Sequence, residues 1–150
     1  MDQNVLQFDK SANDDMTLTY HDSCNVARAS NMGGIMGGQF TIPRKIITTV
    51  VNNYYDMDEE TIKEKTYCCG GGGGLLTDDL MELRVKGALP RMEALKQLIE
   101  EKGVTHMAAI CAICKSQFSK VFQYYDLELD QIVSVHQLVS NAIIMNKKEV

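Results

Sequence analysis

Five cysteines are the residues of this 150-residue chain with the most distinctive chemistry. Cys24 stands alone, Cys68 and Cys69 are adjacent, and Cys111 and Cys114 are separated by two residues. A scheme of disulfides within the chain would leave one of the five thiols over, so it is incomplete. A polynuclear metal site could use every thiolate.

The spacing of these cysteines has consequences for what they can bind. Cys111 and Cys114 can grip one metal atom, because a turn brings both sulfurs to one side. Cys68 and Cys69 diverge in extended backbone, so they reach different metal atoms or different faces of one cluster. A mononuclear tetrahedral site would therefore leave one sulfur unused.

Five glycines, residues 70–74, follow the adjacent cysteines directly. Iron–sulfur clusters are held by thiolates and need a backbone that approaches closely, which glycine allows because it has no Cβ. We therefore expect the backbone of Gly70, Gly71 and Gly72 to surround a bound cluster. A phosphate-binding loop is a weaker interpretation, because the Gly-Lys-Ser/Thr ending is missing.

Other interpretations of the cysteines stay open at this point. A structural zinc site could use four of the five sulfurs. An ordinary cubane cluster could relay electrons. A thioredoxin-like dithiol at Cys111 and Cys114 leaves three cysteines unexplained. Any one of these cysteines, taken alone, could be an ordinary residue of the hydrophobic core. The arrangement of all five together favours a cluster.

Basic residues near the cysteines could assist such a site. His21 lies three residues before the first cysteine and could orient the site or donate a proton, although a histidine at such a position is often hydrogen-bonded packing. Arg28 and Lys115 could balance the charge of a cluster or remain solvated surface residues. His106 and His136 are expected to be structural.

Composition favours one compact domain. The chain has 45% hydrophobic residues and a net charge of -5. We expect residues 1–15 to form a polar N-terminal extension and residues 16–150 to form the cysteine-bearing domain. No apolar run of about 18 residues and no signal peptide is found, which predicts a cytoplasmic protein without a membrane span. The scattered basic residues make nucleic acid an improbable partner.

The first half of the chain predicts a strand, a loop, a helix and a second short strand. Residues 16–21 are typical of a strand that ends just before Cys24. Residues 31–39, which hold four glycines, indicate an irregular loop before Pro43 begins a helix. Residues 61–67 are a weak strand candidate.

The second half predicts helices alternating with strands. Thr77 can cap a helix in which Leu83 faces inward, and Gly87 and Pro90 are expected to interrupt it before a second helix. The remaining expected elements are a strand over 105–110, a helix after Cys114, a strand over 132–135 and a helix over 136–145. The alternation favours an α/β fold with a small parallel sheet flanked by helices and the cysteine ligands in loops at the carboxyl ends of strands.

The order of the cysteines between Tyr20 and Cys114 resembles the cysteine-rich CCG domain found in the B subunit of heterodisulfide reductase and its relatives. The stretches His-Asp-Ser-Cys-Asn-Val-Ala-Arg, Thr-Tyr-Cys-Cys-Gly and Ile-Cys-Ala-Ile-Cys-Lys look similar to the K subunit of the membrane-bound Dsr complex of sulfur-metabolising prokaryotes. The resemblance implies a noncubane [4Fe–4S] cluster. The ligands that it implies are Cys24, Cys68, Cys69, Cys111 and Cys114.

The resemblance also implies a function. The domain would be the catalytic domain or subunit of an oxidoreductase that transfers electrons to a disulfide or trisulfide on a small, DsrC-like sulfur-carrier protein. Ferredoxin-like or membrane cytochrome subunits would donate the electrons and could attach the domain to the inner face of the membrane. A zinc-stabilised interaction module without redox activity is the alternative.

Two features depart from the family pattern. The spacers of 43 residues between Cys24 and Cys68 and 41 residues between Cys69 and Cys111 are longer than in the heterodisulfide reductase subunit. The family subunits usually carry two such domains and ferredoxin-type motifs, whereas this chain has one domain and no such motif. We therefore expect another chain or segment to supply the electrons.

Overall fold

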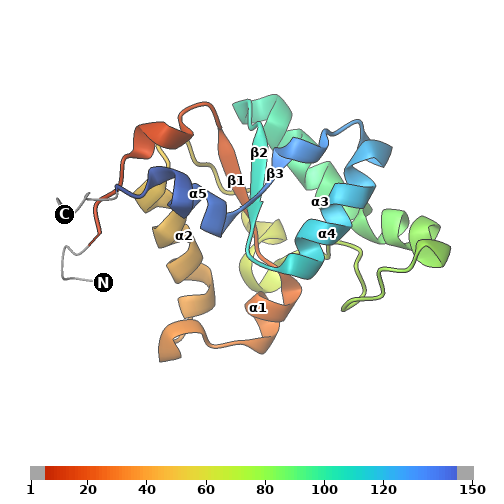
Figure 1. Ribbon diagram of the computed structural model, residues 1–150. Coiled ribbons are helices and arrows are strands. Elements are labelled where there is room, and N and C mark those ends of the chain that lie inside the picture. The colour runs from red at the N-terminus through yellow and green to blue at the C-terminus, as the bar shows by residue number, and fades with distance from the viewer. Residues whose placement is uncertain (1–5, 145–150) are drawn as a thin grey trace, which may run out of the picture.

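Three short parallel strands form the centre of the molecule (Figure 1). The computed structural model describes residues 6–144, with every side chain in that range except that of Leu129. His21 of the first strand pairs with Ala109 of the second, so the two carboxyl ends lie side by side. The strands lie in the order β1 (Leu18–His21), β2 (His106–Ala109) and β3 (Ile132–Ser134).

Helices cover both faces of the sheet, which confirms the predicted α/β fold. α2 and α5 lie on one face, and α3 and α4 lie on the other (Figure 1). The helices are α1 (Cys24–Ala29), α2 (Gly38–Val50), α3 (Met81–Lys102), α4 (Ala112–Val121) and α5 (Val135–Ala142). Short 3₁₀ turns are η1 (Lys10–Asn13), η2 (Met32–Gly34), η3 (Glu59–Thr61), η4 (Lys63–Lys65), η5 (Asp78–Leu80), η6 (Phe122–Tyr125) and η7 (Leu129–Gln131).

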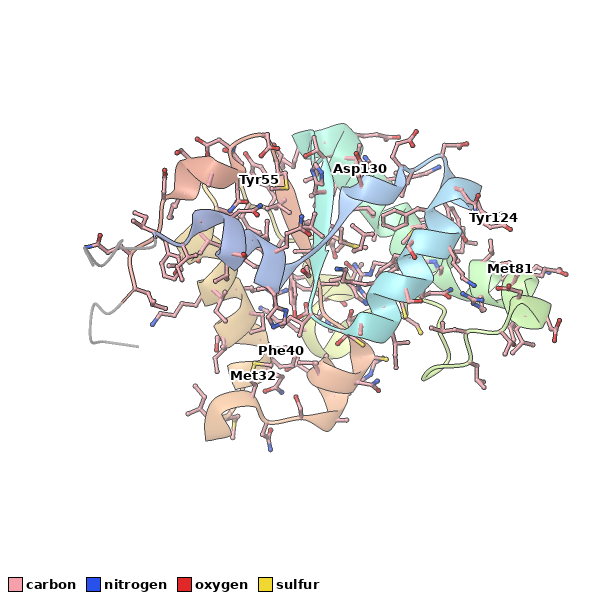
Figure 2. All side chains as sticks on the ribbon, viewed as in Figure 1. Met32, Phe40, Tyr55, Met81, Tyr124 and Asp130 are labelled. Atoms are coloured by element: carbon pink, nitrogen blue, oxygen red, sulfur yellow. The ribbon has the colours of Figure 1, made fainter. Side chains whose placement is uncertain are left out.

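Alternating strand residues divide the interior into two cores, and side chains fill both (Figure 2). Leu18 and Tyr20 pack with α2 and α5, whereas His21 points to the opposite face and meets Phe118 of α4. The core between the sheet and α3 and α4 includes Met92, Leu95, Met107, Phe118, Val121 and Phe122. The core on the other face includes Ile47, Val50, Ala108, Val133, Leu138 and Ala142.

The weak strand expected over residues 61–67 is wrong. This segment consists of the turns η3 and η4, because the Asp58 carboxylate accepts a hydrogen bond from the Glu60 N–H at 2.8 Å and starts a tight turn. Lys63 has a φ of 54°, which a strand does not allow. The adjacent cysteines are therefore positioned by turns and not by the end of a strand.

The expected interruption at Gly87 and Pro90 is also wrong, because both lie inside the continuous helix α3. Pro90 and the residue four positions before it, Lys86, are exposed, so water can replace the backbone hydrogen bond that proline cannot make. Gly87 is used for close packing, because a Cβ there would lie 3.3 Å from the Cα of Gly70. Leu83 is 65% exposed and does not face inward as expected.

Pro43 does not begin α2. The helix starts five residues earlier at Gly38, after Gly37 in a left-handed conformation with a φ of 74°. Phe40 is buried, and packing of its ring stabilises an additional helical turn before the proline.

The two ends of the chain lie partly outside the described range. Asn13 is fully buried, and its side-chain amide donates to the carbonyls of Val50 at 2.9 Å and Leu138 at 3.1 Å. This part of the expected N-terminal extension therefore packs on the domain. The expected final helix is α5, which ends at Ala142, and Met145 lies outside the described residues.

Among residues 6–144, no helix is both long enough and apolar enough to pass through a lipid bilayer.

Candidate metal centre

Two of the three cysteine groups follow the carboxyl ends of neighbouring strands. Cys24 is the first residue of α1, three positions after β1 ends at His21. Cys111 caps the start of α4, two positions after β2 ends, and Cys114 lies in the first turn of that helix. Because the ends of β1 and β2 are paired, these two groups begin from the same edge of the sheet.

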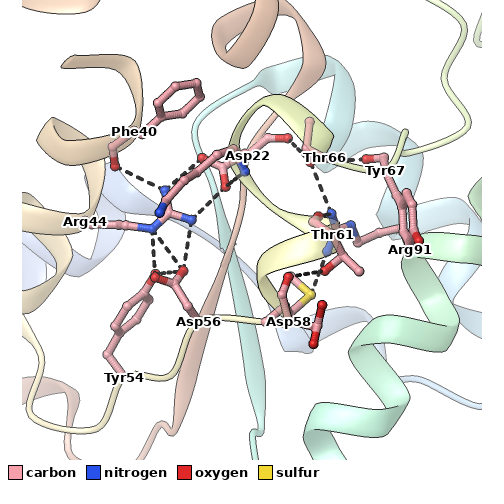
Figure 3. Close-up of polar contacts among 12 residues, drawn as sticks. Asp22, Phe40, Arg44, Tyr54, Asp56, Asp58, Thr61, Thr66, Tyr67 and Arg91 are labelled. Atoms are coloured by element: carbon pink, nitrogen blue, oxygen red, sulfur yellow. Dashed lines mark hydrogen bonds and ion pairs between the residues drawn. The ribbon is translucent and has the colours of Figure 1, made fainter. Parts of the chain in front are cut away.

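Hydrogen bonds hold the third group against that edge. The Thr66 hydroxyl donates to the Asp22 carbonyl at 2.7 Å, and the Lys63 N–H donates to the Asp22 carboxylate at 2.9 Å. Arg28 of α1 donates to the carbonyls of Glu64 and Thr66, both at 3.0 Å. These bonds tie the segment just before Cys68 to the end of β1 and to α1, as Figure 3 shows for Asp22 and Thr66.

The glycine run lies between α3 and the start of α4. A Cβ on Gly70 would lie 2.2 Å from the Arg84 carbonyl oxygen in α3. A Cβ on Gly71 would lie 3.3 Å from both the Cys69 sulfur and the Ile113 side chain, which stands between the two cysteines of α4. The adjacent cysteines are therefore brought close to the Cys111–Cys114 turn, although they are distant in sequence. The nearest neighbour of a Cβ on Gly72 would be the Leu75 side chain at 3.6 Å, and the Gly72 backbone hydrogen-bonds with the Cys68 thiol.

Three of the five thiols interact with one another. Interaction with the Cys114 thiol is the largest of the effects that raise the pKa of Cys69 to about 12, and burial adds to it. Interaction with Cys69, followed by burial, raises the pKa of Cys68. The Gly70 N–H donates to the Cys68 sulfur at 3.3 Å. Without a bound cation, Cys68 and Cys69 therefore hold their protons.

The five cysteines differ in exposure, and none of them forms a disulfide. Cys69 and Cys114 are buried, Cys24 and Cys111 are partly buried, and Cys68 is exposed. Cys111 packs against the core that contains Cys69 and Cys114. The thiol interactions found among the described residues do not include Cys24. This residue lies near the carboxyl ends of β1 and β2 because it is the first residue of α1.

Buried polar atoms without partners gather where β1 ends. Within residues 6–144, no hydrogen-bond partner is found for the hydroxyls of Thr19, Tyr20 and Ser23 or for either ring nitrogen of His21. Buried polar groups in proteins are nearly always hydrogen-bonded. A bound group with acceptor atoms, such as the sulfides of a cluster, would supply partners for these donors.

Among the described residues, no group of three or more histidine, cysteine or acidic side chains is arranged to hold a single metal ion.

The five free thiols, the glycine backbone without Cβ atoms and the unpartnered donors fit an iron–sulfur group. This fit rests on the types of donor present and on the space that the glycines leave at Cys69.

His21 is fully buried, and its ring meets Phe118 edge-on with centroids 4.9 Å apart. Burial, and then the positive charge of Arg91, hold its pKa well below the usual value, so the imidazole is neutral. The other two histidines lie elsewhere: His106 contacts the Thr105 hydroxyl at 2.8 Å, and His136 is exposed on α5. Assistance from His21 in proton transfer stays a prediction.

Sequence reasoning missed two buried arginines of α3. Arg84 is 2% exposed and Arg91 is 0% exposed, and both lie on the helix face that also carries the buried Ala88, Met92 and Leu95. The signal was present in the sequence, because residues at this spacing share one helical face.

The sequence of the chain is similar to those of known proteins. The sequence profile of the CCG cysteine-rich domain matches residues 18–119. The chain is 44% identical over 137 residues to the Hdr-like menaquinol oxidoreductase iron-sulfur subunit 2 of Archaeoglobus fulgidus, covering 91% of the chain and 23% of that protein. It is 43% identical over 140 residues to the Hdr-like menaquinol oxidoreductase iron-sulfur subunit of Archaeoglobus profundus, covering 93% of the chain and 24% of the relative.

The chain thus spans about a quarter of the length of these curated relatives. No solved structure matches the chain.

Proposed function

This chain belongs to the CCG cysteine-rich domain family, and we propose that it is the iron–sulfur redox domain of an Hdr-like electron-transfer complex. Both relatives carry the words iron-sulfur subunit in their names. The observation that carries the proposal is the placement of cysteines from three distant segments around one edge of the sheet.

The residues that would hold the cluster are the five cysteines, Cys24, Cys68, Cys69, Cys111 and Cys114. A cluster of the noncubane [4Fe–4S] type, once bound, would supply electron transfer and an iron atom open to sulfur. Binding would displace the thiol protons of Cys68 and Cys69, and with them the thiol–thiol contacts that now join Cys68, Cys69 and Cys114.

The protein itself would shape access to this site. Cys68 is exposed and lies beside the glycine run, so a partner's sulfur can approach from this side. Cys69 and Cys114 are buried in the core with residues of α3 and α4, so water does not reach them. The Gly70 N–H and the donors at the end of β1 would orient the sulfurs.

We further propose the substrate class, a disulfide or trisulfide carried by a small protein similar to DsrC. Cleavage of one sulfur–sulfur bond consumes two electrons and two protons, and partner subunits would have to deliver the electrons. The names of the two relatives point to menaquinol as a reactant of their complexes. Ferredoxin-like or membrane cytochrome subunits would then hold this domain at the inner face of the membrane.

The test is to purify the chain without oxygen and to measure iron, acid-labile sulfide and zinc. About four irons and four sulfides per chain, with absorption and electron paramagnetic resonance signals, are expected for a noncubane cluster. One zinc per colourless chain would overturn the proposal in favour of a zinc-stabilised interaction module.

A further inference from the structure

Arg91 of α3 is a cation that has only neutral hydrogen-bond acceptors. Its guanidinium donates to the Thr61 carbonyl, to the Thr66 hydroxyl at 3.1 Å and to the Met57 sulfur at 2.7 Å. It also lies over the Tyr67 ring, 5.6 Å from the centroid. Among the residues that the structure describes, no carboxylate forms a salt bridge with it, and its Nε has no partner.

The nearby acidic group, Asp22, forms no salt bridge with Arg91, because both of its oxygens bind Arg44, which Asp22 shares with Asp56. Asp22 raises the pKa of Arg91, although burial has the larger effect and lowers that pKa to about 10. Both oxygens of Asp22 bind Arg44, at 2.9 Å and 2.7 Å (Figure 3). A fully buried cation with neutral partners is costly, because it has lost its hydration without gaining a counter-charge.

The cysteine site can provide the missing negative charge. Cys114 is 2% exposed, and its thiolate form lies close enough to raise the pKa of Arg91. Thr66, which accepts a hydrogen bond from Arg91, lies two residues before Cys68 on the segment that presents the adjacent cysteines. The same side chain therefore contacts the segment that carries one pair of thiols and lies within electrostatic range of another thiol on α4.

We propose that Arg91 is a positioning residue that serves as the buried counter-charge of the thiolate-bound cluster and favours its more negative, reduced state. The inference rests on the proposed function, since it needs thiolates and a redox group at the cysteines. A positive charge stabilises whichever state carries more negative charge, so its removal makes reduction harder.

Two variants separate this role from hydrogen bonding. Arg91→Lys and Arg91→Gln both shorten the side chain and lose the guanidinium geometry, but only the lysine keeps a positive charge beside an anionic site. In the iron-loaded protein we expect the lysine variant to keep a midpoint potential near that of wild type. We expect Arg91→Gln to lower the equilibrium constant for reduction about tenfold, which is about 59 mV for one electron.

A second readout uses the same two variants without iron. In metal-free protein no cluster supplies negative charge to residue 91, so Arg91→Gln should resist urea at least as well as Arg91→Lys. In the loaded protein the order of the two variants should reverse: Arg91→Gln should be the less resistant and should lose iron to a chelator faster than Arg91→Lys. A purely structural role predicts the same order in both states.

Equal potentials for the two variants, or an unchanged order between the metal-free and loaded protein, would overturn the inference. Failure of the proposed function has a different signature, because wild-type protein would then contain no iron and sulfide. The readouts therefore assign a negative result to one proposal or the other.

Discussion

Gly70 and Arg84 meet through their backbones, and a Cβ on Gly70 would lie 2.2 Å from the Arg84 carbonyl oxygen. The same hypothetical atom would lie 2.9 Å from the backbone nitrogen of Ala88, one turn further along α3. Gly70 also has a φ of 84°, in the left-handed region. The loop that carries the adjacent cysteines is therefore fixed to α3 at a point where only glycine fits.

Replacing Gly70 with alanine should destabilise the domain and displace the adjacent cysteines. The strained φ and the clash with the α3 backbone should together lower the free energy of unfolding by about 2–5 kcal/mol. Urea denaturation measures this loss. Gly73→Ala is the matched control, because Gly73 has a φ of 73° but nothing within 4 Å of its Cβ position, so it should cost only about 1 kcal/mol. Equal losses in both variants would contradict the close contact with α3.

Removing Arg44 should leave a buried carboxylate without its ion-pair partner. Asp22 has a side chain only 1% exposed and binds Arg44 through both oxygens. We expect Arg44→Met to lower the free energy of unfolding by about 3 kcal/mol. Lys65→Met is the control, because the Lys65–Glu60 pair is exposed and its loss should leave the free energy of unfolding nearly unchanged. Thermal or urea unfolding of both variants checks the difference.

Serine variants test whether all five cysteines are ligands. Cys24→Ser should reduce the iron content and change the paramagnetic spectrum as strongly as Cys69→Ser, even though Cys24 lies outside the thiol interactions that join Cys68, Cys69 and Cys114. Iron analysis after anaerobic purification measures the effect. An unchanged spectrum in Cys24→Ser would remove this residue from the ligand set, and an unchanged one in Cys69→Ser would favour a four-thiolate site.

His21 should make the domain less stable in mild acid. Burial holds its pKa well below the unfolded value of about 6.5, so the unfolded chain binds the proton more strongly. As the pH falls below about 6.5, unfolding is favoured by up to about 1.4 kcal/mol per pH unit. Stability is thus retained above that pH and lost as the solution becomes more acidic.

The measurement is the urea midpoint at several pH values between about 7.5 and 5.5. His21→Leu should flatten this part of the profile, because it removes the proton that the unfolded chain would bind. His136→Gln is the control, since His136 is exposed on α5, and its profile should follow wild type. A wild-type profile no steeper than that of His21→Leu would show that His21 is not held neutral by burial.

Local sequence patterns predicted the elements that depend on local chemistry. The strands over residues 16–21, 105–110 and 132–135 are found, slightly shorter, because their apolar residues are buried wherever the sheet forms. Predictions that relied on glycine or proline to end a helix were wrong. Pro90 and Gly87 remain inside α3, where packing and exposure to water offset their low helical propensity.

The site could be predicted in its parts but not in its arrangement. The five cysteines and the glycine run were identifiable because thiolate ligands and residues without a Cβ are rare enough to stand out together. Arg91 was not, because the sequence does not show that a charged residue on a helical stripe lacks an acidic partner.

By itself, the sequence determined the α/β class, the family of the domain and the chemistry that its thiols can perform, since these follow from residue types and short spacings. Only the tertiary structure decided which distant groups meet. Parallel pairing of β1 with β2 placed Cys24 and Cys111 at one edge, and the contact between Gly70 and α3 fixed the adjacent cysteines beside them. Burial then left Arg91 without a carboxylate salt bridge among residues 6–144, because long-range packing sets which charges are paired.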